Sequence, residues 1–175
     1  MKIEVRRLAP DDDRTQFRSG NIDLDRFLAR YAGQNQFRHH IGTTYVAVDE
    51  QRVVLGFATI AASELTAARL SQAKRKHLPA YPLPVLRLAR LGVDQRVQGQ
   101  GIAQALLRAV FALAHMMAAD MGCLGVVVDA KPEAVSFYRK LGFIMTEISA
   151  GQLGDRPEPQ PMFIELGAIP SANSH

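Results

Sequence analysis

The chain has 175 residues, of which 47% are hydrophobic, a size and composition typical of one soluble globular domain. Its charged N-terminus excludes a secretory signal peptide, and its single cysteine, Cys123, excludes an internal disulfide. Polar residues interrupt the most apolar stretch, so we expect no membrane span; they are Gln104, Arg108, His115 and Asp120. We expect one cytoplasmic domain over residues 1–169 and a disordered tail over 170–175.

The net charge of +4 is unevenly distributed along the sequence. Residues 65–108 contain eight basic side chains and one acidic side chain, Asp94. The basic residues are Arg69, Lys74, Arg75, Lys76, Arg87, Arg90, Arg96 and Arg108. Two explanations remain open: a solvated face together with ligands for one phosphate-bearing small molecule, or the binding of a polyanion such as RNA.

The first part of the chain predicts strands and helices in alternation. Residues 3–8 alternate as in an edge strand, and Asn21 can cap a helix with an apolar stripe. After that helix we expect, in order, a polar connection at 37–42, a strand at 43–49, a hairpin turn at 49–52, a strand at 53–62, a helix at 64–77 and an extended, proline-containing segment at 79–84.

The middle of the chain predicts a strand, a glycine loop and a helix in succession. Residues 86–93 favour a strand, Gly99 and Gly101 follow, and from Ile102 apolar residues recur every three or four positions. The first turn of such a helix has unpaired N–H groups, and glycine lets a phosphate approach them. Gln104 stands where dinucleotide-binding loops have glycine or alanine, and the Lys-Ser/Thr pair of a P-loop is absent. A tight turn without a ligand remains the alternative.

The last part of the chain adds a second strand–helix–strand unit. Gly122 ends the long helix. We then expect a buried strand at 124–130, a short helix from Pro132 to Lys140, a strand at 143–148, a loop at 149–160 and an edge strand at 162–166. The whole pattern predicts a mixed sheet with helices on both faces.

Two motifs resemble the GNAT N-acetyltransferases. Arg96, Gly99 and Gly101 resemble that family's acyl-CoA loop, and residues 133–143 resemble its Ala-x-x-Phe-Tyr-x-x-x-Gly-Phe segment, with Tyr138 as the tyrosine. The resemblance implies the GNAT fold, of the α/β (α+β) class, whose central mixed, mostly antiparallel sheet has helices on both faces. It also implies acetyl-CoA as cofactor and a tyrosine that points at the thioester sulfur. The implied cofactor-binding residues are Leu91, Gly92, Val93, Arg96, Val97, Gln98, Gly99, Gln100, Gly101, Ile102 and Ala103.

Further positions resemble one branch of that family, the toxins of bacterial GNAT–ribbon-helix-helix toxin–antitoxin systems. They are Phe17, Gly20, Leu24, Asp25, Leu28, Tyr81, Pro82, Pro84, Leu88, Arg90 to Asp94 and Val128 to Ala130. One departure is Gly92, where the branch usually has alanine. The resemblance implies acetylation of the α-amino group of aminoacyl-tRNA, a ribbon-helix-helix antitoxin as partner and a homodimer. With the basic cluster, it assigns substrate binding to Arg90, Arg87, Lys74, Arg75 and Lys76.

The expected chemistry needs few groups. An α-amino group has an ordinary pKa of about 8, so part of it is neutral at cytoplasmic pH and no strong base is required. Tyr138, with an ordinary pKa near 10, suits the general acid that protonates the departing thiolate. A backbone N–H within residues 91–93 is the expected donor to the thioester carbonyl. Direct attack makes a covalent intermediate on Cys123 unnecessary, so we interpret this residue as a packing residue.

Other candidates are weaker. The neighbouring His39 and His40 have poor geometry for one metal ion, and we expect no metal site. His115 is interpreted as a helix-face residue, while Glu64 could act as a base through water. Three functions stay open: an aminoacyl-tRNA acetylating toxin, a GNAT enzyme acting on a small-molecule amine or protein N-terminus, and a non-catalytic acyl-CoA- or RNA-binding module.

Overall fold

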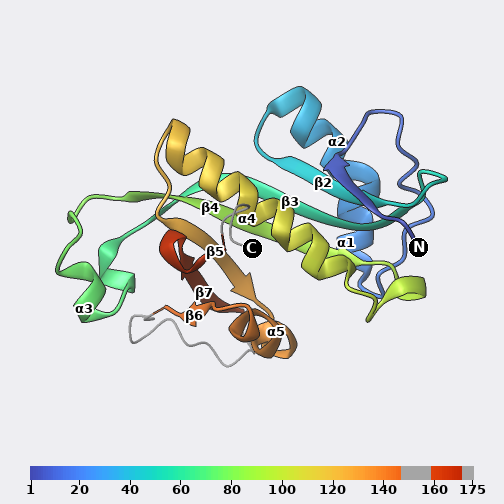
Figure 1. Cartoon of the computed structure of the whole chain (residues 1–175). Helices are drawn as coiled ribbons and strands as arrows, with labels where there is room; N and C mark the ends of the chain where they lie inside the picture. The colour runs from blue at the N-terminus through green and yellow to red at the C-terminus, as the bar shows by residue number, and fades with distance from the viewer. Residues whose placement is uncertain (147–158, 171–175) are drawn as a thin grey trace. The chain divides into compact units, whose positions relative to one another are not determined.

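The computed structural model describes residues 1–146 and 159–170 (Figure 1). Contacts divide the chain into two compact units, one formed by Met1–Ala61 with Leu88–Val110 and the other by Ala62–Arg87 with Phe111–His175. The elements are β1 (Glu4–Arg7), α1 (Ile22–Arg26), α2 (Ala32–Gln34), β2 (Thr43–Val48), β3 (Val54–Leu65), α3 (Gln72–Arg75), β4 (Leu83–Val93), α4 (Ile102–Asp120), β5 (Gly125–Ala130), α5 (Val135–Lys140), β6 (Ile144–Met145) and β7 (Gln160–Glu165). The strands belong to a seven-stranded sheet with the order β1-β2-β3-β4-β5-β7-β6, so the predicted α/β class and mixed sheet are confirmed. That residues 1–169 form a single domain stays a prediction.

The first unit contains an antiparallel meander of β1, β2 and β3. The predicted turn between β2 and β3 is confirmed: the Asp49 carboxylate accepts hydrogen bonds from the N–H groups of Gln51 and Val53, at 2.9 Å each. Strand β1 lies at the end of the strand order, as an edge strand should. The core of this unit is aromatic at its centre, where Phe57 packs edge-to-face on Phe17 and stacked on Phe27.

The N-terminal helical segment runs from Ile22 to His39 and alternates between α-helical and π-helical turns. The predicted cap is confirmed, since the Asn21 side chain accepts hydrogen bonds from the N–H groups of Asp23 and Leu24. The expected polar connection at 37–42 was wrong for its first three residues, which continue the helix. The segment ends at His40, whose φ of 55° is left-handed.

The second unit is built on β5, β7 and β6, which pair antiparallel. Gly125 opens β5, where a Cβ would collide with the carbonyl oxygen of Ile164 on β7. The expectation of an edge strand at 162–166 was wrong, because β6 pairs with the free side of β7 through Ile144 and Phe163. The expected strand at 143–148 is described only to Thr146, while most of the loop at 149–160 and the tail from 171 lie outside the described residues.

The predicted helix at 64–77 was wrong over most of its length. Strand β3 continues to Leu65, a 3-10 turn covers Ala67–Arg69, and only the four residues of α3 are α-helical. From Ala61 to Leu65 the exposure alternates with a period of two, which is the strand period. Strand pairing therefore overrides the helical composition of this stretch.

Helix α4 has a buried apolar face, but of the predicted stripe Ile102, Leu106, Ala109, Leu113 and Met117 only the first two residues are buried. Leu106, Leu107, Val110 and Ala114 are at most 1% exposed. Among the described residues, α4 is the one helix that is long and apolar enough to cross a membrane, so the expectation that its polar residues interrupt such a stretch was wrong. Core helices of soluble proteins are also long and apolar enough to meet these criteria, and α4 packs one apolar face as such helices do.

Candidate active site

The glycine loop joins β4 to α4 in the first unit (Figure 1). Gly99 and Gly101 have φ values of 79° and 82°, which L side chains rarely adopt, and a Cβ added at either would meet no atom within 4 Å. The Ala105 N–H donates to the Gly101 carbonyl at 3.1 Å, so the N–H groups before it lie in the first helical turn, where intrahelical partners are lacking. The loop is thus an open set of donors at the positive end of a 19-residue helix, which fits an oxyanion such as a pyrophosphate.

Asp94 holds the start of this loop in place. Its side chain is buried and accepts hydrogen bonds from the backbone N–H groups of Arg18, at 3.1 Å, and Arg96, at 3.0 Å. The Arg96 guanidinium donates to both carboxylate oxygens, at 2.8 and 2.9 Å. Four donors therefore converge on one buried carboxylate, which fixes the turn that precedes Gly99.

These hydrogen bonds explain the ionisation of Asp94. Burial alone would raise its pKa, but the hydrogen bonds from Arg96 and from the N–H of Arg18, with the positive charge of Arg96, lower the pKa to about 2. The carboxylate is therefore charged at every physiological pH. The signal missed in the sequence was the Asp-x-Arg spacing of a side chain that caps its own turn.

Several residues predicted to bind the cofactor contact other parts of the protein. The Arg96 guanidinium is paired with Asp94, and the Gln98 amide donates to the Ser19 carbonyl at 3.2 Å. Gly92 is buried, and a Cβ there would lie 3.0 Å from the Phe57 ring, so the aromatic core accounts for glycine at this position. Leu91, Val93, Val97, Gln100, Ile102 and Ala103 lie on the strand end, the loop and the first helical turn, as expected.

Tyr138 lies on α5 in the second unit. Its ring is 5% exposed and packs edge-to-face against Phe137 and Phe143, with ring centroids 5.2 and 5.3 Å apart. Gly142, with a φ of 103°, ends this helical stretch and lets the Phe143 N–H donate back to the Tyr138 carbonyl at 3.1 Å. Burial raises the pKa of the phenol to about 12, so Tyr138 stays protonated at physiological pH.

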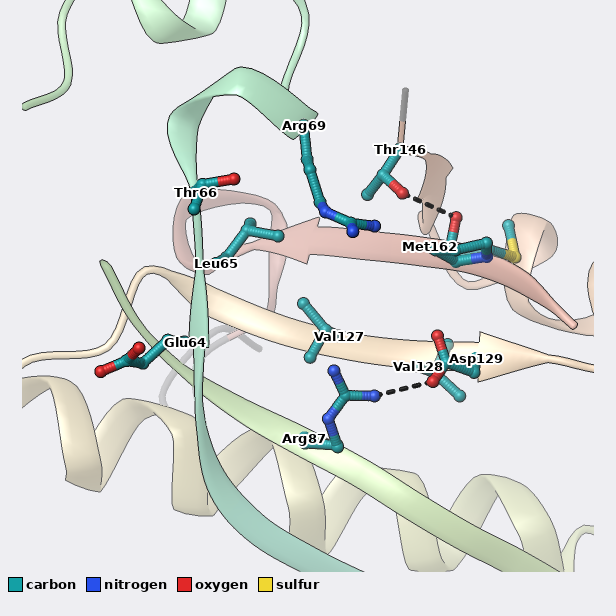
Figure 2. Close-up of a pocket in the computed structure, with 11 residues that line it drawn as sticks. Glu64, Leu65, Thr66, Arg69, Arg87, Val127, Val128, Asp129, Thr146 and Met162 are labelled. Carbon is teal, nitrogen blue, oxygen red and sulfur yellow. Dashed lines mark hydrogen bonds and ion pairs between the residues drawn. The ribbon is translucent and has the colours of Figure 1, made fainter. Parts of the chain in front are cut away.

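A polar pocket of about 330 Å³ also lies in the second unit (Figure 2). Arg69 and Arg87 project into it from opposite sides, and the Arg87 guanidinium donates to Asp129 at 2.9 Å. Glu64 and Thr146 add polar groups to its lining. The pocket therefore offers both charge signs, with Arg69 as a cation and Glu64 as an anion on its wall.

The predicted substrate-binding residues fall in both units. In the second unit, Lys74 pairs with Glu165 at 3.0 Å, while Arg75 and Lys76 are exposed. In the first unit, the Arg90 guanidinium carbon lies 3.8 Å from the centroid of the Phe27 ring, a cation–π contact. Burial lowers the pKa of Arg90 from its ordinary value.

Comparisons with known proteins show the family to which the chain belongs. A family model for the acetyltransferase (GNAT) domain matches residues 40–145. A protein named tRNA-acetylating toxin, from Mycobacterium tuberculosis (strain ATCC 25618 / H37Rv), is 33% identical over 139 residues, which cover 79% of this chain and 82% of the relative. The chain belongs to the GNAT acetyltransferase family.

Solved structures show the same GNAT fold. AtaT complexed with acetyl-methionyl-tRNAfMet matches with a TM-score of 0.83 and 27% identity, covering 96% of this chain and 97% of that one. AtaTR bound with AcCoA matches with a TM-score of 0.76 and 27% identity, covering 95% of each chain. The predicted family and fold are therefore confirmed, and with them the class of enzyme.

The remaining candidates have structural explanations in this GNAT chain. Cys123 is buried, its thiol donates to the Gly125 carbonyl at 3.2 Å, and burial raises its pKa, all of which suit packing. A His115 ring nitrogen lies 3.1 Å from the carbonyl oxygen of Ile169. Among residues 1–146 and 159–170, no three His, Cys, Asp or Glu side chains are grouped to hold a metal ion.

Proposed function

We propose that this GNAT protein is a toxin that transfers an acetyl group from acetyl-CoA to the α-amino group of aminoacyl-tRNA and so blocks translation. The observation that carries the proposal is the open glycine loop at the start of α4, together with a buried, protonated Tyr138. The 33% identity to a protein named tRNA-acetylating toxin supports the choice of substrate. So do the likenesses to AtaT complexed with acetyl-methionyl-tRNAfMet and to AtaTR bound with AcCoA.

The loop residues hold the cofactor through their backbone. The N–H groups from Gly99 to Ala103 bind the pyrophosphate, because glycine at 99 and 101 leaves the approach open. Arg96 contributes its backbone and holds Asp94, since its guanidinium is already paired. Acetyl-CoA supplies the acetyl group as a thioester, and a backbone N–H within residues 91–93 donates to the carbonyl oxygen.

Tyr138 gives its phenolic proton to the thiolate as the carbon–sulfur bond breaks. A pKa of about 12 keeps the phenol protonated at physiological pH before the transfer, and the tyrosinate left after the transfer takes a proton back from solvent. The attacking α-amino group loses its own proton to solvent after the bond to the acetyl carbon forms. No protein base is needed, because part of this amine is neutral near pH 7.

The acceptor side of the proposal uses the basic residues. Arg87, with Arg69 beside it in the polar pocket, and Arg90 contact phosphates of the tRNA, while Arg75, Lys76 and Lys74 extend the positive field. An expected ribbon-helix-helix antitoxin, a homodimeric assembly and a cytoplasmic location complete the proposal. They rest on the resemblance to the toxin branch.

One observation favours a second candidate function, acetylation of a small-molecule amine or a protein N-terminus. The polar pocket contains Glu64 and Asp129, and carboxylates attract a protonated amine rather than a phosphate. Such an enzyme would be insensitive to RNA.

Thiol release separates the two functions. We expect wild-type protein to release CoA thiol from acetyl-CoA with charged total tRNA, and to give background release with uncharged tRNA or free amino acids. Equal release with free amino acids and with charged tRNA would favour the second function. Release with neither would contradict the proposed function.

A further inference from the structure

A set of exposed aromatic and basic side chains belongs to the second half of the N-terminal helical segment in the first unit. We call it the aromatic–basic patch; it consists of Arg30, Tyr31, Phe37, Arg38, His39 and His40, all exposed. The two aromatic rings are unusually open for their size, with 43% of Tyr31 and 41% of Phe37 exposed. The roles proposed above leave this patch unused.

The patch has no acidic residue to balance it. Residues 26–48 contain neither Asp nor Glu. Within Met1–Ala61 and Leu88–Val110, the ion pairs of the structure involve neither Arg30 nor Arg38. The positive charge of the patch is therefore open to an external anion.

A pocket of about 180 Å³ adjoins the same segment. Asn35 and Ile41 line it from the segment and the turn after it, and the Ile41 N–H donates to the Asn35 carbonyl at 3.1 Å. Arg90 lines it from β4 while it stacks on Phe27. The pocket thus places the amide side chain of Asn35 and the apolar side chain of Ile41 beside the guanidinium of Arg90, next to the patch in the sequence.

From these features we infer that the aromatic–basic patch binds unpaired nucleotides of the tRNA substrate. Tyr31 and Phe37 stack on bases, and Arg30 and Arg38 contact the adjoining phosphates. Base stacking needs exposed rings, and a polyanion needs unopposed cations; this surface has both. A hydrophobic protein partner would account for the rings but not for the cations. The inference rests on the proposed function, which it deepens by adding a second binding surface for the same substrate.

The test compares two acceptors of different size. Charged tRNA carries nucleotides beyond its aminoacyl end, whereas puromycin, an aminoacyl-nucleoside, carries an α-amino group on one nucleoside only. We expect Tyr31→Leu and Phe37→Leu to raise the KM for charged tRNA about tenfold each, because each variant lacks a ring on which a base can stack. Their kcat and KM with puromycin should equal those of wild type.

Matched variants separate stacking and charge from unfolding. Leucine keeps an apolar side chain at both positions, so weaker tRNA affinity with unchanged thermal unfolding would reflect the missing ring. Arg38→Ala should also raise the KM for charged tRNA, whereas Arg7→Ala, an exposed arginine on β1, should not. Tyr81→Leu, at a 65% exposed tyrosine in the second unit, is the aromatic control.

Each outcome decides between the inference and the proposed function. An active wild type whose tRNA KM is unchanged in Tyr31→Leu, Phe37→Leu and Arg38→Ala would overturn the inference and leave the function intact. If wild type fails to acetylate charged tRNA, fluorescence anisotropy with uncharged tRNA replaces the KM, and equal affinities of variants and wild type would overturn the inference. Weakened antitoxin binding with unchanged tRNA affinity would identify the patch as a protein-docking surface and overturn it as well.

Discussion

Tyr138 is the residue that we propose as the general acid, and its surroundings are described by the structure. Its ring is fixed by Phe137 and Phe143, and burial raises its pKa to about 12. We expect Tyr138→Phe to lower kcat by about 10²- to 10⁴-fold, because the variant keeps the ring but cannot donate a proton. The Kd for acetyl-CoA, measured by calorimetry, should change little.

The pH profile adds a second check on Tyr138. For wild type, kcat/KM should rise as the α-amino group of the acceptor loses its proton near pH 8, and should show no loss from the phenol up to about pH 11. Tyr81→Phe, at an exposed tyrosine, is the control. Full turnover by Tyr138→Phe would show that another group protonates the thiolate.

Asp94 makes the loop sensitive to acid. Its pKa is about 2 in the folded protein and 3.8 ordinarily, so the charged carboxylate stabilises the fold above pH 4 and this contribution is lost as the pH falls toward 2. We expect Asp94→Asn to lower the free energy of unfolding at pH 7 by about 1–3 kcal/mol, since charge-assisted hydrogen bonds to Arg96 and Arg18 are weakened.

Urea unfolding between pH 2 and pH 7 measures this effect. The difference between Asp94→Asn and wild type should shrink as the pH falls below 4, whereas Glu50→Gln, at an exposed turn residue, should follow wild type throughout. A difference that stays constant down to pH 2 would show that the charge of Asp94 is not what stabilises the loop.

Candidate site positions could be predicted where a motif defines them. The contacts that the fold adds to these side chains could not. The roles of Tyr138, Gly99 and Gly101 are predicted from spacing and resemblance and stay predictions. The pairing of Arg96 with Asp94 was not predicted, because sequence alone does not say which way a guanidinium turns. The need for Gly92 was hidden for the same reason, since Phe57 lies 35 positions away in the sequence.

At the scale of elements, Gly99 and Gly101 give the glycine loop a backbone conformation that L side chains rarely adopt. They also leave its N–H groups open to a ligand. We expect Gly99→Ala and Gly101→Ala to lower stability by about 1–2 kcal/mol each, because both φ values are left-handed. We also expect a raised Kd for acetyl-CoA, since the added methyl group stands in front of the N–H donors. Calorimetry and urea unfolding measure the two effects separately.

Two other glycines separate these effects. Gly122→Ala, at a φ of 105° after α4, should lose stability but keep the wild-type affinity for acetyl-CoA. Gly167→Ala, where an added Cβ meets nothing and φ is ordinary, should change neither quantity. Wild-type cofactor affinity in both loop variants would contradict a pyrophosphate site at this loop.

Elements whose apolar residues recur with a regular period could be predicted from the sequence. Elements whose extent or position depends on strand pairing could not. The turn residues after β2 and the three- and four-residue spacing of α4 are local, so the sequence contains them. The extension of β3 to Leu65 and the internal position of β7 depend on neighbouring strands from distant parts of the chain. The helix-favouring composition at 64–77 was therefore a weak guide.

At the scale of the whole molecule, binding of a polyanion should depend on salt. Removing one cation that neutralises a phosphate reduces the slope of log affinity against log salt by about 0.7 to 0.9. We expect Arg75→Ala and Lys76→Ala each to reduce the slope for tRNA by about that amount, and Lys74→Ala to reduce it less because Lys74 pairs with Glu165. Lys2→Ala, at an exposed lysine, is the control. Unchanged slopes in Arg75→Ala and Lys76→Ala would show that the polyanion binds elsewhere.

The central claim is that the acetyl group reaches the amino group of a charged tRNA, and mass spectrometry tests it most directly. Total charged tRNA is incubated with the protein and isotopically labelled acetyl-CoA, then digested with nuclease to release the aminoacyl-adenosine ends. We predict labelled N-acetyl-aminoacyl-adenosine with wild type and only a trace with Tyr138→Phe. Unlabelled aminoacyl-adenosine from both proteins, with label transferred by wild type to a small amine instead, would contradict the account.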